Sequence, residues 1–204
     1  MAAARTLSSK GRQTRQALAD AARTLFAQRG FHGTTLSDIT AAAGRSPAVF
    51  YRYFTDKEDL LAALADSFLD EVRADRSAPP VDADYFVSVV SAYWKTFKPN
   101  IGIMIAVDQL AATEPRFALA QNQFRSFGMD IISASVRRAQ EQGRAPDLNA
   151  DHAALAIALL FEQFTAVCLR PDTAGLGIRI SDEDAVHTLS TIWKNTLYGN
   201  LKEN

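Results

Sequence analysis

The segment that decides the fold covers residues 34–60 and reads TTLSDITAAAGRSPAVFYRYFTDKEDL. It pairs Thr35 with Asp38 three residues later, a capping pattern that favours the start of a short helix. Gly44 follows the apolar positions of this helix. Glycine is suited to a helix end because it readily adopts the left-handed conformation found there. The segment therefore opens with a short helix and a turn.

A second short helix follows the turn. Ser46 is a favoured N-cap residue, and Pro47 is suited to the first helical position. An amphipathic pattern over residues 14–29 precedes the segment, and a third helix starts near Asp56 and runs to about Arg76. Two short helices joined by a glycine-containing turn are typical of a helix-turn-helix, whose second helix enters the major groove of DNA.

The rest of the chain is also predicted to be helical. Apolar residues at helical spacing, separated by proline and glycine, indicate helices over residues 82–97, 101–112, 115–142, 151–170 and 181–198. No stretch shows the sustained alternation of a β-strand, so we predict an all-α protein. We expect a flexible basic arm over residues 1–13, a helix-turn-helix DNA-binding domain over residues 14–60, and a larger helical domain over residues 61–204.

Charge is distributed unevenly along the chain. Residues 1–55 carry eight Lys and Arg residues against two acidic ones, a net charge of +6, and the whole chain carries −1, which leaves −7 for the remainder. A basic module on an acidic remainder is expected when one end of a protein meets phosphates. The N-terminal region could bring Arg5, Lys10, Arg12 and Arg15 to DNA, or it could be a solvated tail; the sequence leaves both open.

Other features favour a cytoplasmic protein without catalytic activity. Cys168 is the one cysteine, so no disulfide can form within the chain, as is usual in a reducing cytosol. The longest apolar run, residues 153–161, is shorter than the ~20 residues of a membrane span. His32, His152 and His187 lie far apart and form no metal-ligand motif. We therefore expect no metal, no cofactor, no membrane partner and no enzymatic reaction.

Several short motifs in and around the helix-turn-helix lie at characteristic distances from one another along the sequence. They are Leu25-Phe26, Gly30, Thr34-Thr35, Ile39-Thr40, Ala43-Gly44, Ser46, Phe50-Tyr51-Arg52-Tyr53-Phe54 and Lys57-Glu58-Asp59-Leu60. Over residues 14–61 this pattern resembles the TetR family of bacterial transcriptional regulators. Beyond residue 61 only length, helical content and position agree. Arg45 departs from the family pattern, which has an aliphatic residue there, and Tyr53 replaces the usual histidine.

The resemblance implies two kinds of DNA contact. Thr35, Tyr51, Tyr53 and Lys57 are expected to meet phosphates, because hydroxyl and ammonium groups donate hydrogen bonds to anions. The other DNA-binding candidates lie on or beside the recognition helix and are Arg45, Ser46, Pro47, Ala48, Val49 and Arg52. We expect Arg45 to add a base contact, such as a bidentate one to guanine, the alternative being a solvated or locally paired side chain. For Val49 and Tyr53 the alternative is a place in the core.

The resemblance also implies a homodimer and a ligand cavity in the larger domain. The helix over residues 151–170 is apolar almost all round, so we expect both of its sides to be covered. In the family the last two helices form the dimer interface. The candidates here are Leu155, Leu159, Glu162, Leu189, Trp193 and Leu197, with burial inside one protomer as the alternative.

The cavity is expected among large apolar residues of the middle helices and their polar neighbours. The candidates are Phe68, Trp94, Phe97, Met104, Val107, Asp108, Phe124, Phe127, Ile131, Phe161, Phe164 and Cys168, each of which could instead be plain core.

We therefore predict a ligand-responsive transcriptional repressor that binds a near-palindromic double-stranded DNA operator as a homodimer. A small, largely apolar ligand is expected to release it. A constitutive DNA-binding or architectural protein, whose larger domain has no cavity and only dimerises, is the main alternative. A small helical enzyme is disfavoured.

Overall fold

The computed structural model describes residues 8–74, 85–170 and 180–199. Its helices are α1 (Ser9–Arg29), α2 (Leu36–Ala42), α3 (Pro47–Phe50), α4 (Lys57–Ala74), α5 (Tyr85–Phe97), the 3-10 turn η1 (Lys98–Asn100), α6 (Ile101–Ala111), α7 (Pro115–Glu141), α8 (Ala150–Leu169) and α9 (Asp182–Tyr198). No strand occurs in these three ranges. The all-α prediction is confirmed.

Local sequence signals account for several helix ends. The Thr35 hydroxyl accepts a hydrogen bond from the Asp38 amide while the Asp38 carboxylate accepts one from the Thr35 amide, which is the complete capping box. Gly30 and Gly44 adopt φ values of 72° and 62°, the left-handed region that favours glycine. Ser46 departs from the prediction. It occupies the N-cap position of α3, but its side chain makes no capping hydrogen bond.

The described part of the predicted flexible arm is helical from Ser9. Residues 1–7, which include Arg5, lie outside the described residues. Ser8 caps α1 by accepting a hydrogen bond from the Gly11 amide at 3.2 Å, and the helix is continuous from Ser9. The prediction that the arm extends to residue 13 is therefore wrong, and Lys10 and Arg12 lie on the first turn of α1.

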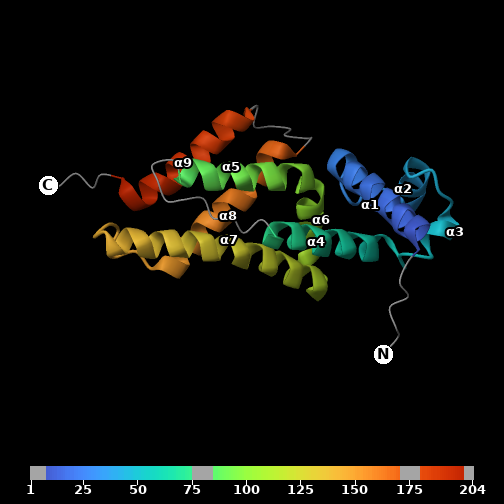
Figure 1. Ribbon diagram of the computed structural model, residues 1–204, viewed down its shortest axis with the longest axis horizontal. Helices are drawn as coiled ribbons and strands as arrows, with labels where there is room; N and C mark the ends of the chain where they lie inside the picture. Colours follow the sequence, from blue (N-terminus) through green and yellow to red (C-terminus); the bar gives the residue numbers. More distant parts are fainter. Residues whose placement is uncertain (1–7, 75–84, 171–179, 200–204) are drawn as a thin grey trace.

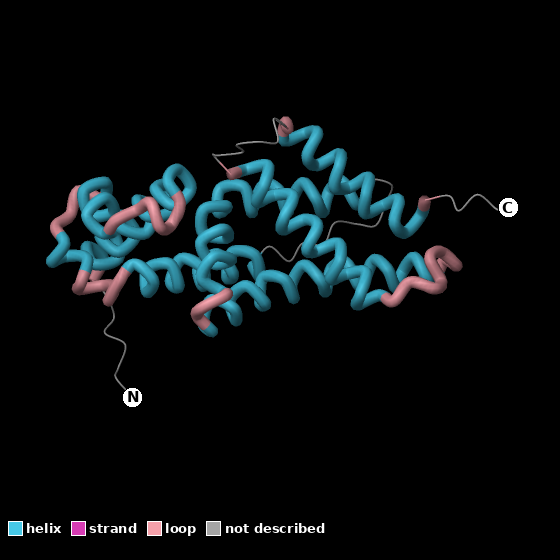
Figure 2. Tube along the Cα trace, turned by 180° about the vertical axis from the view of Figure 1, so that it is seen from behind, coloured by secondary structure: helices cyan, strands magenta, loops and turns pink. Residues whose placement is uncertain are grey.

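The molecule is elongated, with α1, α2 and α3 at one end and the remaining helices running along its length (Figure 1). Helix α4 leads from the small end into the larger bundle, and α5 lies beside α9. Helix α7 packs against both α6 and α8. The view from behind shows the same division into a small end and a long bundle (Figure 2).

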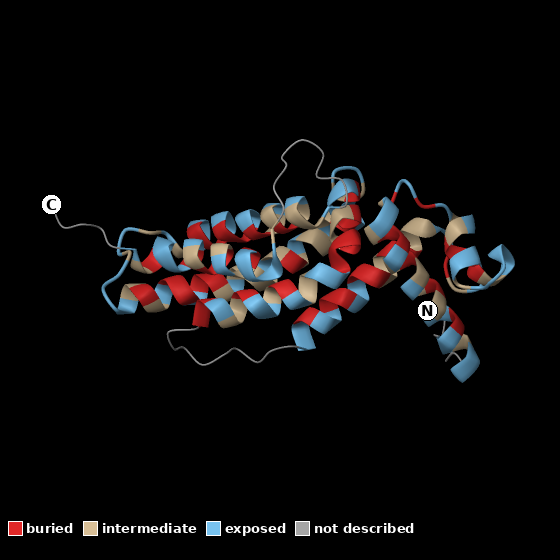
Figure 3. Cartoon of the chain, turned by 90° about the horizontal axis from the view of Figure 1, so that it is seen from above, coloured by how far each residue is buried: buried red, intermediate tan, exposed pale blue. Residues whose placement is uncertain are grey.

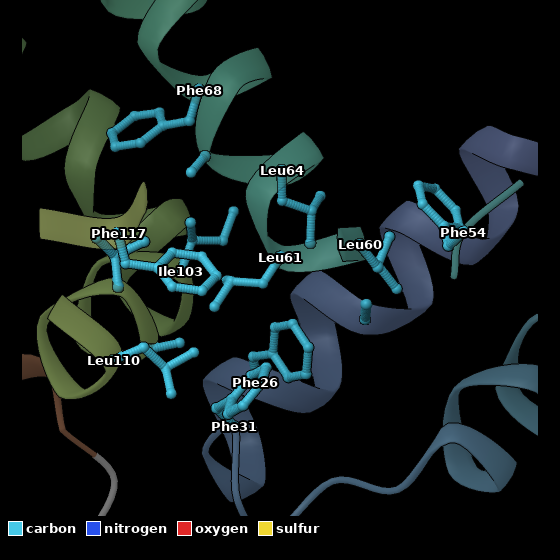
Figure 4. Close-up of a cluster of buried hydrophobic side chains, with 14 of the residues drawn as sticks. Phe26, Phe31, Phe54, Leu60, Leu61, Leu64, Phe68, Ile103, Leu110 and Phe117 are labelled. Carbon is cyan, nitrogen blue, oxygen red and sulfur yellow. The ribbon is translucent and has the colours of Figure 1, made fainter. Parts of the chain in front are cut away.

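Two hydrophobic clusters hold the fold together. The first joins α1, α2 and α3 to α4, α6 and the first half of α7, and Figure 4 shows Phe26 and Phe31 of the small end near Leu61, Ile103 and Phe117. The second lies between α5, α8, α9 and the second half of α7. The expected domain boundary after residue 60 stays a prediction, but the first cluster runs continuously across it.

Helix α8 is the one helix among the described residues that is long and apolar enough to cross a membrane by length and composition. Such a single helix is weak evidence of a membrane, because the core helix of a soluble protein passes the same test. Buried and exposed residues alternate along α8, as they do along the other helices of the bundle (Figure 3). One apolar face packs inside the protomer, and another, which includes Leu155 and Leu159, is left open.

Candidate nucleic-acid interface and ligand cavity

Phe50 fixes the orientation of the recognition helix α3. Its side chain is fully buried in the first cluster together with Ile39 of α2, and its ring lies 5.5 Å from that of Phe54. Because α3 is a single helical turn, burying this one residue turns the opposite face toward solvent. Ala48 is exposed on that face, and Pro47 is exposed at the first position of the helix.

The structure places the predicted DNA-binding residues on one end of the molecule. Six of the predicted side chains besides that of Tyr51 are exposed, namely Thr35, Arg45, Ser46, Pro47, Ala48 and Arg52. Tyr51 is 62% exposed, a large value for an aromatic residue with no partner but the edge of Phe50 among the described side chains. Val49 and Tyr53 are half-buried, so each has both a core side and a surface side.

Two of the exposed residues also make local bonds. The Arg45 guanidinium donates to the Gly44 carbonyl at 3.1 Å and stays at the surface beside the turn. The Thr35 hydroxyl also lies 2.6 Å from the Asp38 carboxylate, and hydrogen bonds from Thr35 lower the pKa of Asp38. The hydroxyl of Thr35 is thus used to cap α2, at whose start Thr35 lies.

Lys57 has internal partners that the sequence did not reveal. Its Nζ donates to the carbonyls of Phe31 and Thr34, both at 2.8 Å, and lies 4.1 Å from the centre of the Phe31 ring. Burial lowers the pKa of this ammonium group. Lys57 therefore ties the start of α4 to the turn between α1 and α2. The two hydrogen bonds leave one N–H of the ammonium group unused. The expected phosphate contact of Lys57 would be made by this N–H and stays a prediction.

A cavity of about 270 Å³ lies inside the larger bundle. Of the residues predicted to line it, the structure brings together Phe97, Met104, Phe124, Phe127, Ile131 and Phe161. Tyr93 also lines it, together with residues that the sequence did not single out, which include Tyr85, Val89, Thr96 and Arg125. A smaller hollow of about 50 Å³ shares Tyr93, Phe97, Met104 and Glu162 with the first.

The other predicted cavity residues lie elsewhere. Phe68 and Val107 are buried in the first cluster, and the Phe68 ring stands behind the cavity, 5.0 Å from that of Phe124. The indole of Trp94 donates to Asp182 at 3.0 Å and so joins α5 to α9. Asp108 lines the smaller hollow only.

Phe164 and Cys168 pack at the edge of the second cluster, and burial raises the pKa of the Cys168 thiol. Helical periodicity identified apolar residues but not which of them face a void.

The polar groups of the cavity are mostly paired. Arg125 of α7 and Glu162 of α8 form a two-bond ion pair at 3.1 and 2.8 Å, with both side chains 20% exposed. Hydrogen bonds to Glu162 raise the pKa of the Arg125 guanidinium. The Tyr93 hydroxyl lies 3.0 Å from the Thr165 hydroxyl and donates to the Phe161 carbonyl at 3.2 Å. Burial raises the pKa of Tyr93 well above its usual range.

The predicted dimer residues divide into two groups. Leu189, Trp193 and Leu197 are buried in the protomer's own second cluster, so their assignment to a dimer interface is wrong. They fill the inner face of α9 because the apolar stripe of that helix packs on α5 and α7. Leu155 and Leu159 are exposed on α8, and Glu162 is engaged with Arg125 at the cavity.

Several of the exposed large apolar residues lie on α8 and α9. Leu155, Leu159, Leu160 and Val167 of α8 and Ile192 of α9 are each 38 to 41% exposed. Ile192 is exposed on α9, whereas its neighbour Trp193, about 100° further around the helix, is buried. We refer to these five residues as the outer apolar face.

A one-turn helix anchored by Phe50 and exposed at its start, set in a three-helix unit, defines a DNA-binding protein of the helix-turn-helix class. Residues 18–64 match the family model described as bacterial regulatory proteins, tetR family. The chain is 24% identical over 203 residues to the transcriptional regulator EthR of Mycolicibacterium smegmatis, a match that covers 97% of this chain and 92% of EthR. It is 25% identical over 150 residues to UidR of Escherichia coli K12, covering 70% and 75% of the two chains.

A solved structure has the same fold. A transcriptional regulator of Saccharomonospora viridis, crystallised in complex with choline, superposes with a TM-score of 0.72 at 20% identity and covers 90% of this chain and 96% of its own. This chain belongs to the TetR family of transcriptional regulators. Members of the family bind DNA operators, typically as repressors.

Proposed function

We propose that this chain is a ligand-responsive transcriptional repressor of the cytoplasm that binds a near-palindromic operator as a homodimer. The exposed face of α3 above the buried Phe50 is the observation that carries the DNA-binding part. Arg45 and Arg52 bring positive charge to the two ends of this face, and Tyr51 brings an exposed hydroxyl. Residues that read bases and residues that hold phosphates would thus act side by side.

Arg45→Ala tests the base-reading role. We expect it to weaken binding to the operator by about 1–3 kcal/mol and to leave binding to random DNA almost unchanged, because a guanine contact adds specific energy only. Tyr51→Phe is the matched contrast. It should weaken binding to both DNAs alike, since a phosphate contact carries no sequence information. Fluorescence anisotropy at several salt concentrations measures both. An unchanged ratio of specific to random affinity in Arg45→Ala would show that Arg45 reads no base.

We propose that the outer apolar face pairs with its copy in a second protomer. The face combines exposed aliphatic side chains of α8 with Ile192 of α9, and solvent contact of such side chains is unfavourable. A two-fold arrangement brings the same patch of both protomers together. It would present two α3 helices ~34–36 Å apart, which matches successive major grooves on one side of B-DNA.

Leu159→Arg tests the dimer. A guanidinium placed in an apolar interface without a counter-ion should weaken dimerisation at least about tenfold and reduce operator binding with it. Leu119→Arg is the matched control, because Leu119 is a 60% exposed leucine of α7 away from the outer apolar face. Sedimentation velocity measures the monomer–dimer equilibrium. If Leu159→Arg and wild type show the same dissociation constant, the dimer is built elsewhere.

We propose that the cavity of about 270 Å³ is the effector site. Its lining is mainly aromatic and aliphatic with a few polar groups, the usual character of a small-molecule site. The relative from Saccharomonospora viridis, which was crystallised with choline, supports effector binding by this fold. A constitutive DNA-binding protein would be expected to have a filled core, so the cavity favours the ligand-responsive function.

Two linked measurements test the proposal. The genomic fragments that the protein retains identify its operator, and the genes beside that operator suggest which small molecules to try. We expect at least one apolar compound to release the purified dimer from the operator. A protein that binds its operator with an affinity indifferent to every such compound would instead be the constitutive regulator.

A further inference from the structure

The larger hollow is lined by an almost entirely uncharged wall. Among its lining residues, the charged side chains are Arg125 from α7 and Glu162 from α8. The others are apolar, aromatic or hydroxyl-bearing, and the Tyr93 ring contacts the rings of Phe97 and Phe161. The net charge of the lining is therefore zero, and the positive and the negative side chain lie next to each other.

The two charges are committed to each other. Arg125 Nε donates to Glu162 Oε1 at 3.1 Å, and Arg125 Nη2 donates to Oε2 at 2.8 Å. A third bond runs from Nη1 to the Asn122 side-chain oxygen at 3.3 Å. Parallel bonds between a guanidinium and a carboxylate fix the geometry as well as the charge balance. Both partners are only 20% exposed, so water screens them little.

The pair stands where the two hollows meet. Glu162 lines both hollows, whereas Arg125 lines only the larger one. The smaller hollow is more polar, with Asp108, Gln121, Gln163 and Arg170 in its wall. Asp108 there already accepts a hydrogen bond from Gln121 at 2.7 Å. A molecule with its apolar body in the larger hollow would thus reach charged groups only at the junction.

The nearby hydroxyl is also satisfied. Tyr93 lies within hydrogen-bond distance of both the Phe161 carbonyl and Thr165, so it offers a ligand little. The Arg125–Glu162 pair itself can still form further hydrogen bonds. A carboxylate oxygen can accept more than one hydrogen bond, and a guanidinium has five N–H donors, of which three are used here.

We infer that the Arg125–Glu162 pair selects an uncharged effector, an apolar molecule with a neutral hydroxyl, carbonyl or amide head group that hydrogen-bonds to the intact pair. A carboxylate or ammonium head would find its counter-ion already bound and would have to break the two-bond contact or remain unpaired. An unpaired charge at a largely apolar site is strongly unfavourable. The inference rests on the proposed function, since it gives the ligand class of the same cavity.

The test uses the full chain and three probes that share one alkyl chain. They are 1-decanol, decanoate and decylammonium, and isothermal titration calorimetry without DNA measures their binding. We expect wild type to bind decanol about tenfold or more tightly than either ion, in line with the strength of hydrogen bonds to charged groups. Glu162→Gln leaves Arg125 without its counter-ion and should make decanoate the preferred probe. Arg125→Gln should make decylammonium the preferred probe.

Asp151→Asn is the matched control. It breaks another ion pair between α7 and α8, Arg137 to Asp151 at 2.9 Å, whose side chains are largely exposed and line neither hollow. The order of the three probes should stay that of wild type. If a single variant at the pair fails to fold, which its circular dichroism would show, the wild-type order decides by itself.

The outcomes separate the inference from the function. Tighter binding of either ion than of decanol by wild type overturns the inference, as does an order that stays the same in both folded variants. Binding of none of the three probes overturns it too. In each case the proposed function would still be supported if some other compound released the protein from the operator. If no compound changed the operator affinity, the proposed ligand-responsive function would be wrong as well.

Discussion

Gly102→Ala is expected to destabilise the protein by about 1–3 kcal/mol, the usual range for an extra methyl in a tight contact. Gly102 lies on α6 where that helix crosses α1. A Cβ built there would lie 2.4 Å from the Ala27 nitrogen and 2.7 Å from the Phe26 carbonyl carbon. Both are backbone atoms of α1, so no side chain can rotate away. The two helices would have to separate.

The intrinsic preference of helices for alanine acts in the opposite direction by about 0.5–1 kcal/mol, which makes the control informative. Gly128 lies within α7, and a Cβ there would meet nothing within 4 Å. We expect Gly128→Ala to raise the free energy of unfolding and Gly102→Ala to lower it, as measured by urea denaturation with an unchanged m value. Equal or greater stability of Gly102→Ala would mean that the α1–α6 approach is loose.

The same substitution should reach the DNA-binding end. Helix α1 packs on α6 and shares the first cluster with α2 and α3. A displacement of α1 would therefore change the position of α3 relative to the bundle. Operator affinity should therefore fall in Gly102→Ala even under conditions where the variant is fully folded. Fluorescence anisotropy well below the unfolding midpoint measures this second effect.

Lys57→Met is expected to reduce the free energy of unfolding by about 2–4 kcal/mol. Methionine has an unbranched side chain of similar length but lacks the ammonium group that donates to the Phe31 and Thr34 carbonyls. Hydrogen bonds from charged donors contribute about 1.5–3 kcal/mol each, and a partly buried carbonyl left without its donor is unfavourable. The contact of the ammonium with the Phe31 ring is lost as well.

Lys95→Met serves as the control for Lys57→Met. Lys95 is exposed on α5, and its replacement should change stability by no more than about 0.5 kcal/mol. Thermal unfolding followed by circular dichroism gives both values. A Lys57→Met protein that is as stable as wild type but binds all DNA more weakly would assign Lys57 to phosphate contact instead of to the turn between α1 and α2.

The sequence was sufficient for the helices and for the exposed surface of α3. Capping residues such as Thr35 and Ser181, and glycines such as Gly44, act on neighbours a few residues away, so their effect can be predicted locally. The exposure of Arg45 and Tyr51 follows from the same local pattern once Phe50 is identified as the core residue. These features need no knowledge of distant contacts.

The sequence was insufficient wherever a residue's role depends on a distant partner. Lys57 bonds to carbonyls 23 and 26 residues away, and Arg125 pairs with Glu162 37 residues away. Helix α9 presents a similar difficulty, because Ile192 and Trp193 are both large and apolar, yet Ile192 is exposed and Trp193 is buried. Periodicity gives the angle between two residues but not which of them faces a second helix.

The first hydrophobic cluster also limits how regulators of this kind can be recombined. A hybrid made by joining residues 1–60 of another protein to residues 61–204 of this one would cut between Leu60 and Leu61, both fully buried. It would place foreign side chains against Leu64, Ile103 and Phe117, which lie on three different helices of the recipient (Figure 4). A new DNA specificity would be transferred more safely by exchanging only the exposed residues of α3 and leaving Phe50 and its surroundings unchanged.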